Sequence, residues 1–138
     1  MRILCLDVGD KKIGVSLSDP THSIAQALKV YRRNSLKDDL KEFRNIISEY
    51  DIERIVIGLP KDLSGAIGKK AQEVIGFAEA LEKHVDVPVV LWDERFTTNE
   101  AHRVFEMASI SHKKRRPYLD MMASQLILQG YLDAKGPR

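Results

Sequence analysis

Three short segments carry carboxylates at positions where an acidic side chain is unusual. Asp7 lies inside the apolar run 3–9, Asp93 and Glu94 follow a second apolar run, and Asp120 lies near the start of the last expected helix. A charge taken out of water without a partner costs several kcal/mol, or its pKa shifts until the group is neutral. Such residues therefore usually lie at strand ends, where a cation or a ligand compensates them.

Carboxylates that meet at one site repel each other unless a cation binds between them. Hard oxygen ligands with open coordination positions suit Mg²⁺ or Mn²⁺, which can activate water for attack on a phosphate. We assign Asp7 as the bridging ligand, completed by Glu94 and Asp120, with Asp93 as the alternative to Glu94. Taken singly, Asp7 could cap a turn before Gly9, and Asp120 could be an ordinary acidic residue of a first helical turn. The metal-site hypothesis therefore depends on the three segments converging.

A strongly basic segment precedes Asp120. It reads His-Lys-Lys-Arg-Arg at residues 112–116. Such a run is often a solvated loop, and the competing interpretation is contact with the phosphates of a nucleic acid. The closeness of Asp120 favours phosphate contact, so the predicted nucleic-acid-binding residues here are Lys113, Lys114, Arg115 and Arg116.

Two further segments place cations beside the acidic candidates. Lys11 and Lys12 form a turn close after Gly9, where a glycine indicates either the close approach of another backbone, such as that of a nucleic acid, or a hairpin with a positive φ. Arg95 directly follows Glu94 and could bind a phosphate in bidentate fashion. We therefore add all three basic residues to the predicted nucleic-acid-binding set.

Composition restricts the class of protein. The chain has 138 residues, 43% of them apolar and 30% charged, which predicts one soluble globular domain. No apolar run approaches the roughly 20 residues of a membrane span, no secretory signal is visible, and a single cysteine fits a reducing compartment, so we expect a cytoplasmic protein. The four histidines show no metal-ligand spacing and no recognisable acidic partner, which predicts surface or packing roles: His22, His84, His102 and His112.

The periodicity of apolar residues predicts five strands. Strands are expected at 3–8, 13–17 and 24–31, joined by connections short enough for an antiparallel meander. Two more are expected at 55–58 and 87–92. A helical period appears four times after the third strand, with expected helices at about 35–50, 71–81, 97–108 and 117–134, the first capped by Asn34 or Ser35.

This order of elements predicts an α/β fold. Three antiparallel strands are followed by strand–helix units, whose crossovers make parallel neighbours. We expect a mixed five-stranded sheet in the order 3-2-1-4-5 with helices on both faces. In that sheet, Asp7 and the pair Asp93-Glu94 end at the same edge, where α/β proteins bind ligands.

Several segments resemble one known family, the YqgF or RuvX family. They are 7–15 (Asp-Val-Gly-Asp-Lys-Lys-Ile-Gly-Val), 57–60 (Ile-Gly-Leu-Pro), 93–98 (Asp-Glu-Arg-Phe-Thr-Thr), 120–123 and 127–129, and the resemblance runs nearly end to end. It implies a ribonuclease H-like fold over residues 1–138 and a divalent-metal endonuclease in the bacterial cytoplasm. The implied substrate is the 5′ end of precursor 16S rRNA, and the acidic positions of the family fall on Asp7, Glu94 and Asp120.

Two positions depart from the family pattern, and several functions compete. The loop 61–68 lacks the usual Asn/Asp-Gly-Ser/Thr sequence, and Met121 replaces a common lysine, whose phosphate contact Arg115 or Arg116 could supply.

The alternative functions are a Holliday-junction resolvase that cuts DNA as a dimer and a nucleic-acid-binding module without turnover. An ATP-handling domain is a further alternative, because Asp-x-Gly followed by lysine and glycine also resembles a phosphate loop of actin-like ATPases. The sequence leaves open a monomer or a homodimer.

Overall fold

The computed structural model describes residues 1–60, 67–93 and 112–135, with side chains in the last segment from Met122 onward. The strands are β1 (Arg2–Val8), β2 (Lys12–Ser18), β3 (Ala25–Arg32), β4 (Ile52–Leu59) and β5 (Val89–Asp93). The helices are α1 (Leu36–Tyr50), α2 (Lys69–His84) and α4 (His112–Lys135). The helix expected at 97–108 falls outside the described residues.

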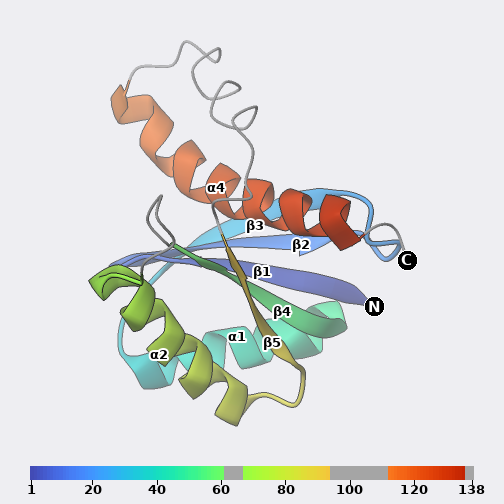
Figure 1. Ribbon diagram of the computed structural model, residues 1–138, viewed down its shortest axis with the longest axis horizontal. Helices are drawn as coiled ribbons and strands as arrows, with labels where there is room; N and C mark the ends of the chain where they lie inside the picture. Colours follow the sequence, from blue (N-terminus) through green and yellow to red (C-terminus); the bar gives the residue numbers. More distant parts are fainter. Residues whose placement is uncertain (61–66, 94–111, 136–138) are drawn as a thin grey trace.

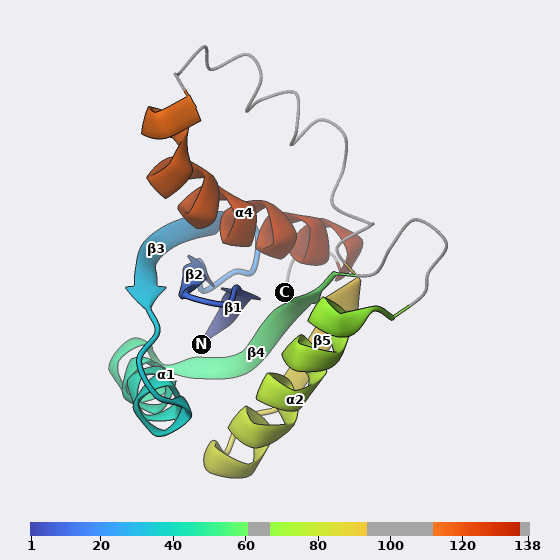
Figure 2. The ribbon, with the colours of Figure 1, turned by 90° about the vertical axis from the view of Figure 1, so that its left-hand side faces the viewer.

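One mixed sheet organises the molecule, in the order β3-β2-β1-β4-β5. β1 pairs antiparallel with β2 and parallel with β4, β2 pairs antiparallel with β3, and β4 pairs parallel with β5. The predicted order 3-2-1-4-5 is confirmed, and β1 occupies the centre of the sheet. Helices α1 and α2 cover one face, while α4 crosses the other (Figures 1 and 2).

Alternation along the central strand divides the core into two layers. Leu4, Leu6 and Val8 belong to the cluster formed with α1 and α2. Ile3 and Cys5 belong to the cluster formed with α4. Successive side chains of a strand point to opposite faces, so the residues of β1 from Ile3 to Val8 can be assigned to the two layers in turn.

The first helix begins at a cap that the sequence predicted. Ser35 accepts a hydrogen bond from the Asp38 backbone N–H at 3.1 Å through its Oγ, which identifies Ser35, rather than Asn34, as the N-cap. Leu40 and Phe43 are buried in α1 as expected, whereas Leu36 is 48% exposed.

Gly76 lies within α2 and has no heavy atom within 4 Å of an added Cβ position, so it does not mark a close packing contact. The helix therefore carries a glycine that its packing does not require.

The last helix differs from the expectation in where it begins. It starts at His112, so the basic run 112–116 belongs to α4 and Pro117 is its sixth residue rather than a member of its first turn. The proline removes one backbone hydrogen bond from the helix, and the lysines and arginines before it are good helix formers. No described helix is long and apolar enough to cross a membrane.

Two glutamine side chains fix α4 against the edge strand β3. Gln129 Oε1 accepts a hydrogen bond from the Ala25 backbone N–H at 2.9 Å, and Gln125 Nε2 donates to the Ala25 carbonyl at 3.1 Å. Further along, Arg54 Nη1 donates to the Tyr131 hydroxyl at 2.8 Å. These contacts join α4 to the edge strand β3 and to β4 on the other side of β1.

Candidate active site

Asp7 lies on the face of the sheet that α4 covers. It follows Cys5 by two residues in β1, and Cys5 packs in the α4 cluster. Its partner in register on β2 is Gly14, which has no side chain. The space beside the half-buried Asp7 carboxyl group is therefore not filled from the neighbouring strand, at the carboxyl end of the central strand.

Asp93 lies on the opposite face. Its partner in register on β4 is Leu59, which packs in the cluster of α1 and α2, and Trp92 packs in the α4 cluster. Paired residues of neighbouring strands share a face, so the sheet separates the Asp7 and Asp93 side chains. This placement argues against Asp93 as the alternative to Glu94.

The other predicted ligands fall outside the described side chains. Glu94 and Arg95 follow the last described residue of β5, and the side chains of 112–121 are not described, although their backbone is part of α4. Of the predicted site residues, the structure thus places Asp7, Asp93, Lys11 and Lys12. The predicted contacts of Arg95, Lys113, Lys114, Arg115 and Arg116 remain predictions.

Within the described ranges, no three His, Cys, Asp or Glu residues are grouped so that they could hold a metal ion. Of the predicted set, Glu94 lies outside those ranges, and the side chain of Asp120 is not among those described. Its chemistry, three carboxylates without a cysteine or histidine, is the type that Mg²⁺ and Mn²⁺ prefer.

The turn after Asp7 is built by backbone contacts. The Gly9 N–H donates to the Lys12 carbonyl at 2.9 Å, and a Cβ on Gly9 would lie 2.8 Å from that carbonyl oxygen. Gly9 does not adopt a positive φ, so the close approach of a backbone explains the glycine, and that backbone is Lys12 of the same chain. The turn holds Lys11 and Lys12 beyond the carboxyl end of β1.

An arginine that the sequence analysis did not single out fixes this turn. Arg33 Nη1 donates to the Gly9 carbonyl at 3.0 Å, and the Arg33 backbone N–H donates to the Lys11 carbonyl at 2.9 Å. Its guanidinium lies 5.2 Å from the centroid of the Phe77 ring. The connection after β3 therefore holds the turn after β1 in place.

Asp39 completes this arrangement from α1. It is 1% exposed, and its Oδ2 accepts from Arg33 Nε at 2.9 Å while its Oδ1 accepts from the Asn34 N–H at 3.1 Å. Burial and a hydrogen bond to Asp39 raise the pKa of Tyr31 to about 12. An acidic residue in the first turn of a helix usually faces solvent, so no local signal indicated that Asp39 is buried.

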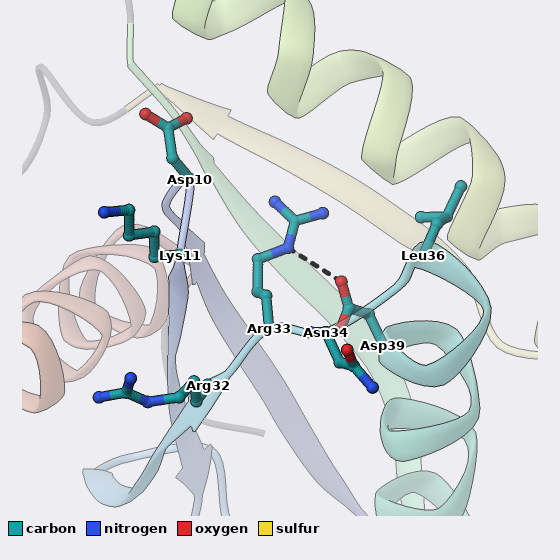
Figure 3. A pocket seen from close by; sticks show the side chains of 7 residues that line it. All are labelled: Asp10, Lys11, Arg32, Arg33, Asn34, Leu36 and Asp39. Atoms are coloured by element: carbon teal, nitrogen blue, oxygen red, sulfur yellow. Dashed lines mark hydrogen bonds and ion pairs between the residues drawn. The ribbon is translucent and has the colours of Figure 1, made fainter.

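A cavity of about 400 Å³ opens between the turn and α1. In Figure 3, Lys11 and Arg32 extend along one side of it, and Arg33, Asn34 and Asp39 lie on the side of α1. The lining residues are Asp10, Lys11, Arg32, Arg33, Asn34, Leu36 and Asp39.

Of the two histidines with described side chains, one has the acidic partner that the sequence analysis did not find. His22 Nε2 lies 2.6 Å from Glu53 Oε1 and 3.2 Å from the Met1 carbonyl. His22 has a positive φ of 60°, and Glu53 is distant in sequence, so no spacing rule could have paired them. The pair lies at the amino end of β1 and β4, away from Asp7. His84 is exposed, as expected.

Comparisons with known proteins agree with this architecture. A family model described as "RuvX: Holliday junction resolvase" matches residues 1–134. A relative from Thermoanaerobacter pseudethanolicus is 48% identical over 136 residues, which cover 98% of each chain, and one from Desulforamulus reducens is 46% identical over 134 residues, which cover 97% of this chain and 98% of the relative. Both relatives are named "Putative pre-16S rRNA nuclease".

Two solved structures share the fold at low identity. Thermus thermophilus RuvC in complex with a Holliday junction substrate matches with a TM-score of 0.64 and 13% identity, covering 100% of this chain and 98% of RuvC. A Fowlpox virus resolvase bound to Holliday junction DNA matches with a TM-score of 0.56 and 16% identity, covering 98% of this chain and 99% of the resolvase. The predicted ribonuclease H-like fold is thereby confirmed.

Proposed function

Because this chain belongs to the RuvX family and is a phosphodiester hydrolase, we propose that it is a divalent-metal-dependent endonuclease that processes the 5′ end of precursor 16S rRNA. Residues 1–138 act as one nuclease domain in the cytoplasm. The observation that supports this proposal most directly is the position of Asp7, at the carboxyl end of the central strand, beside a glycine and under α4.

Asp7, Glu94 and Asp120 would hold Mg²⁺ or Mn²⁺. When bound, such an ion activates water and stabilises the negative charge that develops on the phosphate oxygens. Asp120 precedes the buried Ser124 by four residues in α4, a spacing that puts two helix positions on one side. That spacing is consistent with a site shared between α4 and Asp7.

The basic residues orient the substrate in this proposal. Lys11 and Lys12 bind phosphates beside Asp7 from a turn that Gly9 and Arg33 hold in place. Arg95 and the four basic residues at 113–116 bind further phosphates, and Arg115 or Arg116 takes the place of the lysine that Met121 replaces. Binding through several phosphates predicts an affinity that falls steeply with salt.

The test is cleavage of a 5′-extended 16S rRNA precursor by the purified protein, with Mn²⁺ or with EDTA, beside Asp7→Asn. We expect metal-dependent cutting that the variant loses while it still binds the RNA. If neither the wild type nor Asp7→Asn cuts the RNA, although both proteins bind it, the result would instead favour a binding module without turnover.

A Holliday-junction resolvase is the second candidate, and the description of the matching family model favours it. A metal site of this kind acts on the phosphodiester and does not read the sugar. A synthetic four-way DNA junction in the same assay separates the two functions, because paired, symmetric cuts by a dimer would identify a resolvase.

A further inference from the structure

Lys12 and Arg32 form a basic pair on the same face as Asp7. They are partners in register between the antiparallel strands β2 and β3, two positions away from the partners Gly14 and Val30. Gly14 is also the partner of Asp7 on β1. Side chains two residues apart share a face, so Lys12 and Arg32 lie on the face of Asp7, one step nearer the turn.

The distance from Asp7 to this pair suits a polynucleotide. Neighbouring strands lie about 5 Å apart, so β1 and β3, with β2 between them, are separated by about 10 Å. Arg32 is also displaced along the strand by two residues, or about 7 Å, so the Cα atoms of Asp7 and Arg32 lie roughly 12 Å apart. A phosphate near Arg32 would then belong to a nucleotide a short distance along the strand from one bound at Asp7.

The cavity beside this pair has positive charge that is not matched within it. The charge of Asp39 is paired with Arg33, which leaves exposed Lys11 and Arg32 against a single exposed acid, Asp10. The Arg32 side chain makes no hydrogen bond or ion pair with any residue of the described part of the chain.

Arg33 adds a fixed donor to the cavity. Its Nε and Nη1 are held by Asp39 and Gly9, and among the described residues no acceptor bonds its Nη2. A guanidinium with two donors fixed keeps its remaining donors in a defined direction, which suits a phosphate oxygen.

We propose that Lys12, Arg32 and the cavity at the β3–α1 connection bind phosphates of the RNA strand whose scissile bond lies at Asp7. This subsite deepens the proposed function and rests on it. The RNA backbone then leaves the metal site across the turn after β1, toward the edge strand β3, and Arg33 is a positioning residue that shapes the subsite.

The experiment measures RNA binding without cleavage. Fluorescence anisotropy in EDTA, with a labelled 5′-extended 16S precursor fragment, is recorded over a series of salt concentrations. We expect Arg32→Ala to weaken binding about 3- to 10-fold and to lower the salt slope by about 0.7 to 1, the change expected for one lost phosphate contact. Arg32→Lys should retain most of the slope.

Arg44→Ala is the matched control. It removes the same charge from an exposed position of α1 that does not line the cavity. Equal binding losses for Arg32→Ala and Arg44→Ala would overturn the subsite, because net charge alone would then explain them. Inorganic phosphate can be added as a competitor of the RNA in the same assay. If Arg32→Ala changed only the competition by inorganic phosphate and left the affinity for RNA unchanged, the subsite for RNA would also be overturned.

Cleavage in Mn²⁺ separates this inference from the proposed function. We expect Arg32→Ala to raise KM with kcat unchanged, because it removes binding remote from the reacting phosphate. If Asp7→Asn still cut RNA, the proposed function would fail while the binding result for Arg32 would stand. A larger loss with a four-way DNA junction than with RNA would contradict the assignment to an RNA strand.

Discussion

Arg33 and Asp39 form an ion pair that links the end of β3 to the first turn of α1, with Nε 2.9 Å from Oδ2 and Asp39 1% exposed. The same guanidinium reaches the Gly9 carbonyl in the turn after β1. One buried pair thereby fixes the position of the turn that carries Lys11 and Lys12 relative to Asp7.

Arg33→Ala should lower the free energy of unfolding by about 2–3 kcal/mol, because it leaves a buried carboxylate without its cation. Urea denaturation measures the change. The control is Lys29→Ala, which removes the more exposed ion pair between Lys29 and Glu42 and should cost less than about 1 kcal/mol. Equal losses for both variants would contradict the structural role of Arg33.

Tyr31 should titrate abnormally late. Burial, followed by its hydrogen bond to Asp39, raises the pKa of Tyr31 to about 12 from 10.0. The folded state therefore favours the protonated phenol, and this contribution to stability is complete below pH 10 and is lost as pH rises toward 12. The difference in tyrosinate absorbance between the wild type and Tyr31→Phe measures this pKa. Asp39→Asn should lower it.

Asp7 and Asp93 should differ in cleavage assays. Asp7→Asn removes a carboxylate from the α4 face and should reduce metal-dependent cleavage by more than about a hundredfold. Asp93→Asn changes a residue on the other face and should leave cleavage within a few fold. A loss with Asp93→Asn as large as that with Asp7→Asn would show that Asp93 takes part in the site.

Two glycines should respond in opposite directions to alanine. Gly9→Ala would place a Cβ 2.8 Å from the Lys12 carbonyl oxygen and should destabilise the fold by about 1–3 kcal/mol. Gly76→Ala meets no atom within 4 Å and should stabilise α2 by about 0.5–1 kcal/mol. Thermal unfolding of both variants tests this, and a neutral Gly9→Ala would contradict the described turn.

The sheet was predictable because its signals are local. Apolar runs, the change from a strand period to a helical period, and short connections suffice for the order 3-2-1-4-5, and Ser35 was one of two expected caps. The start of α4 was not predicted, because Pro117 was interpreted as a first-turn residue although the basic residues before it also favour a helix.

The site was only partly predictable, because its supporting contacts join distant segments. Asp7 was recognisable as a carboxylate in an apolar strand. The connection of Gly9 to Arg33 spans 24 residues, and its effect on the turn depends on how β3 returns to α1. Likewise, only the register of β4 and β5 shows that Asp93 faces away from Asp7.

The contact of α4 with Ala25 has a consequence for synthesis of the protein. Gln125 and Gln129 follow Ala25 by 100 and 104 residues, so at ribosomal speeds the strand leaves the ribosome about 5 to 20 seconds before its helix. During that interval Ile3, Cys5 and Val56 lack the apolar partners that α4 provides. The nascent chain therefore lacks the cover of α4 on the Asp7 face of its sheet until α4 has left the ribosome, and nuclease activity should begin only then.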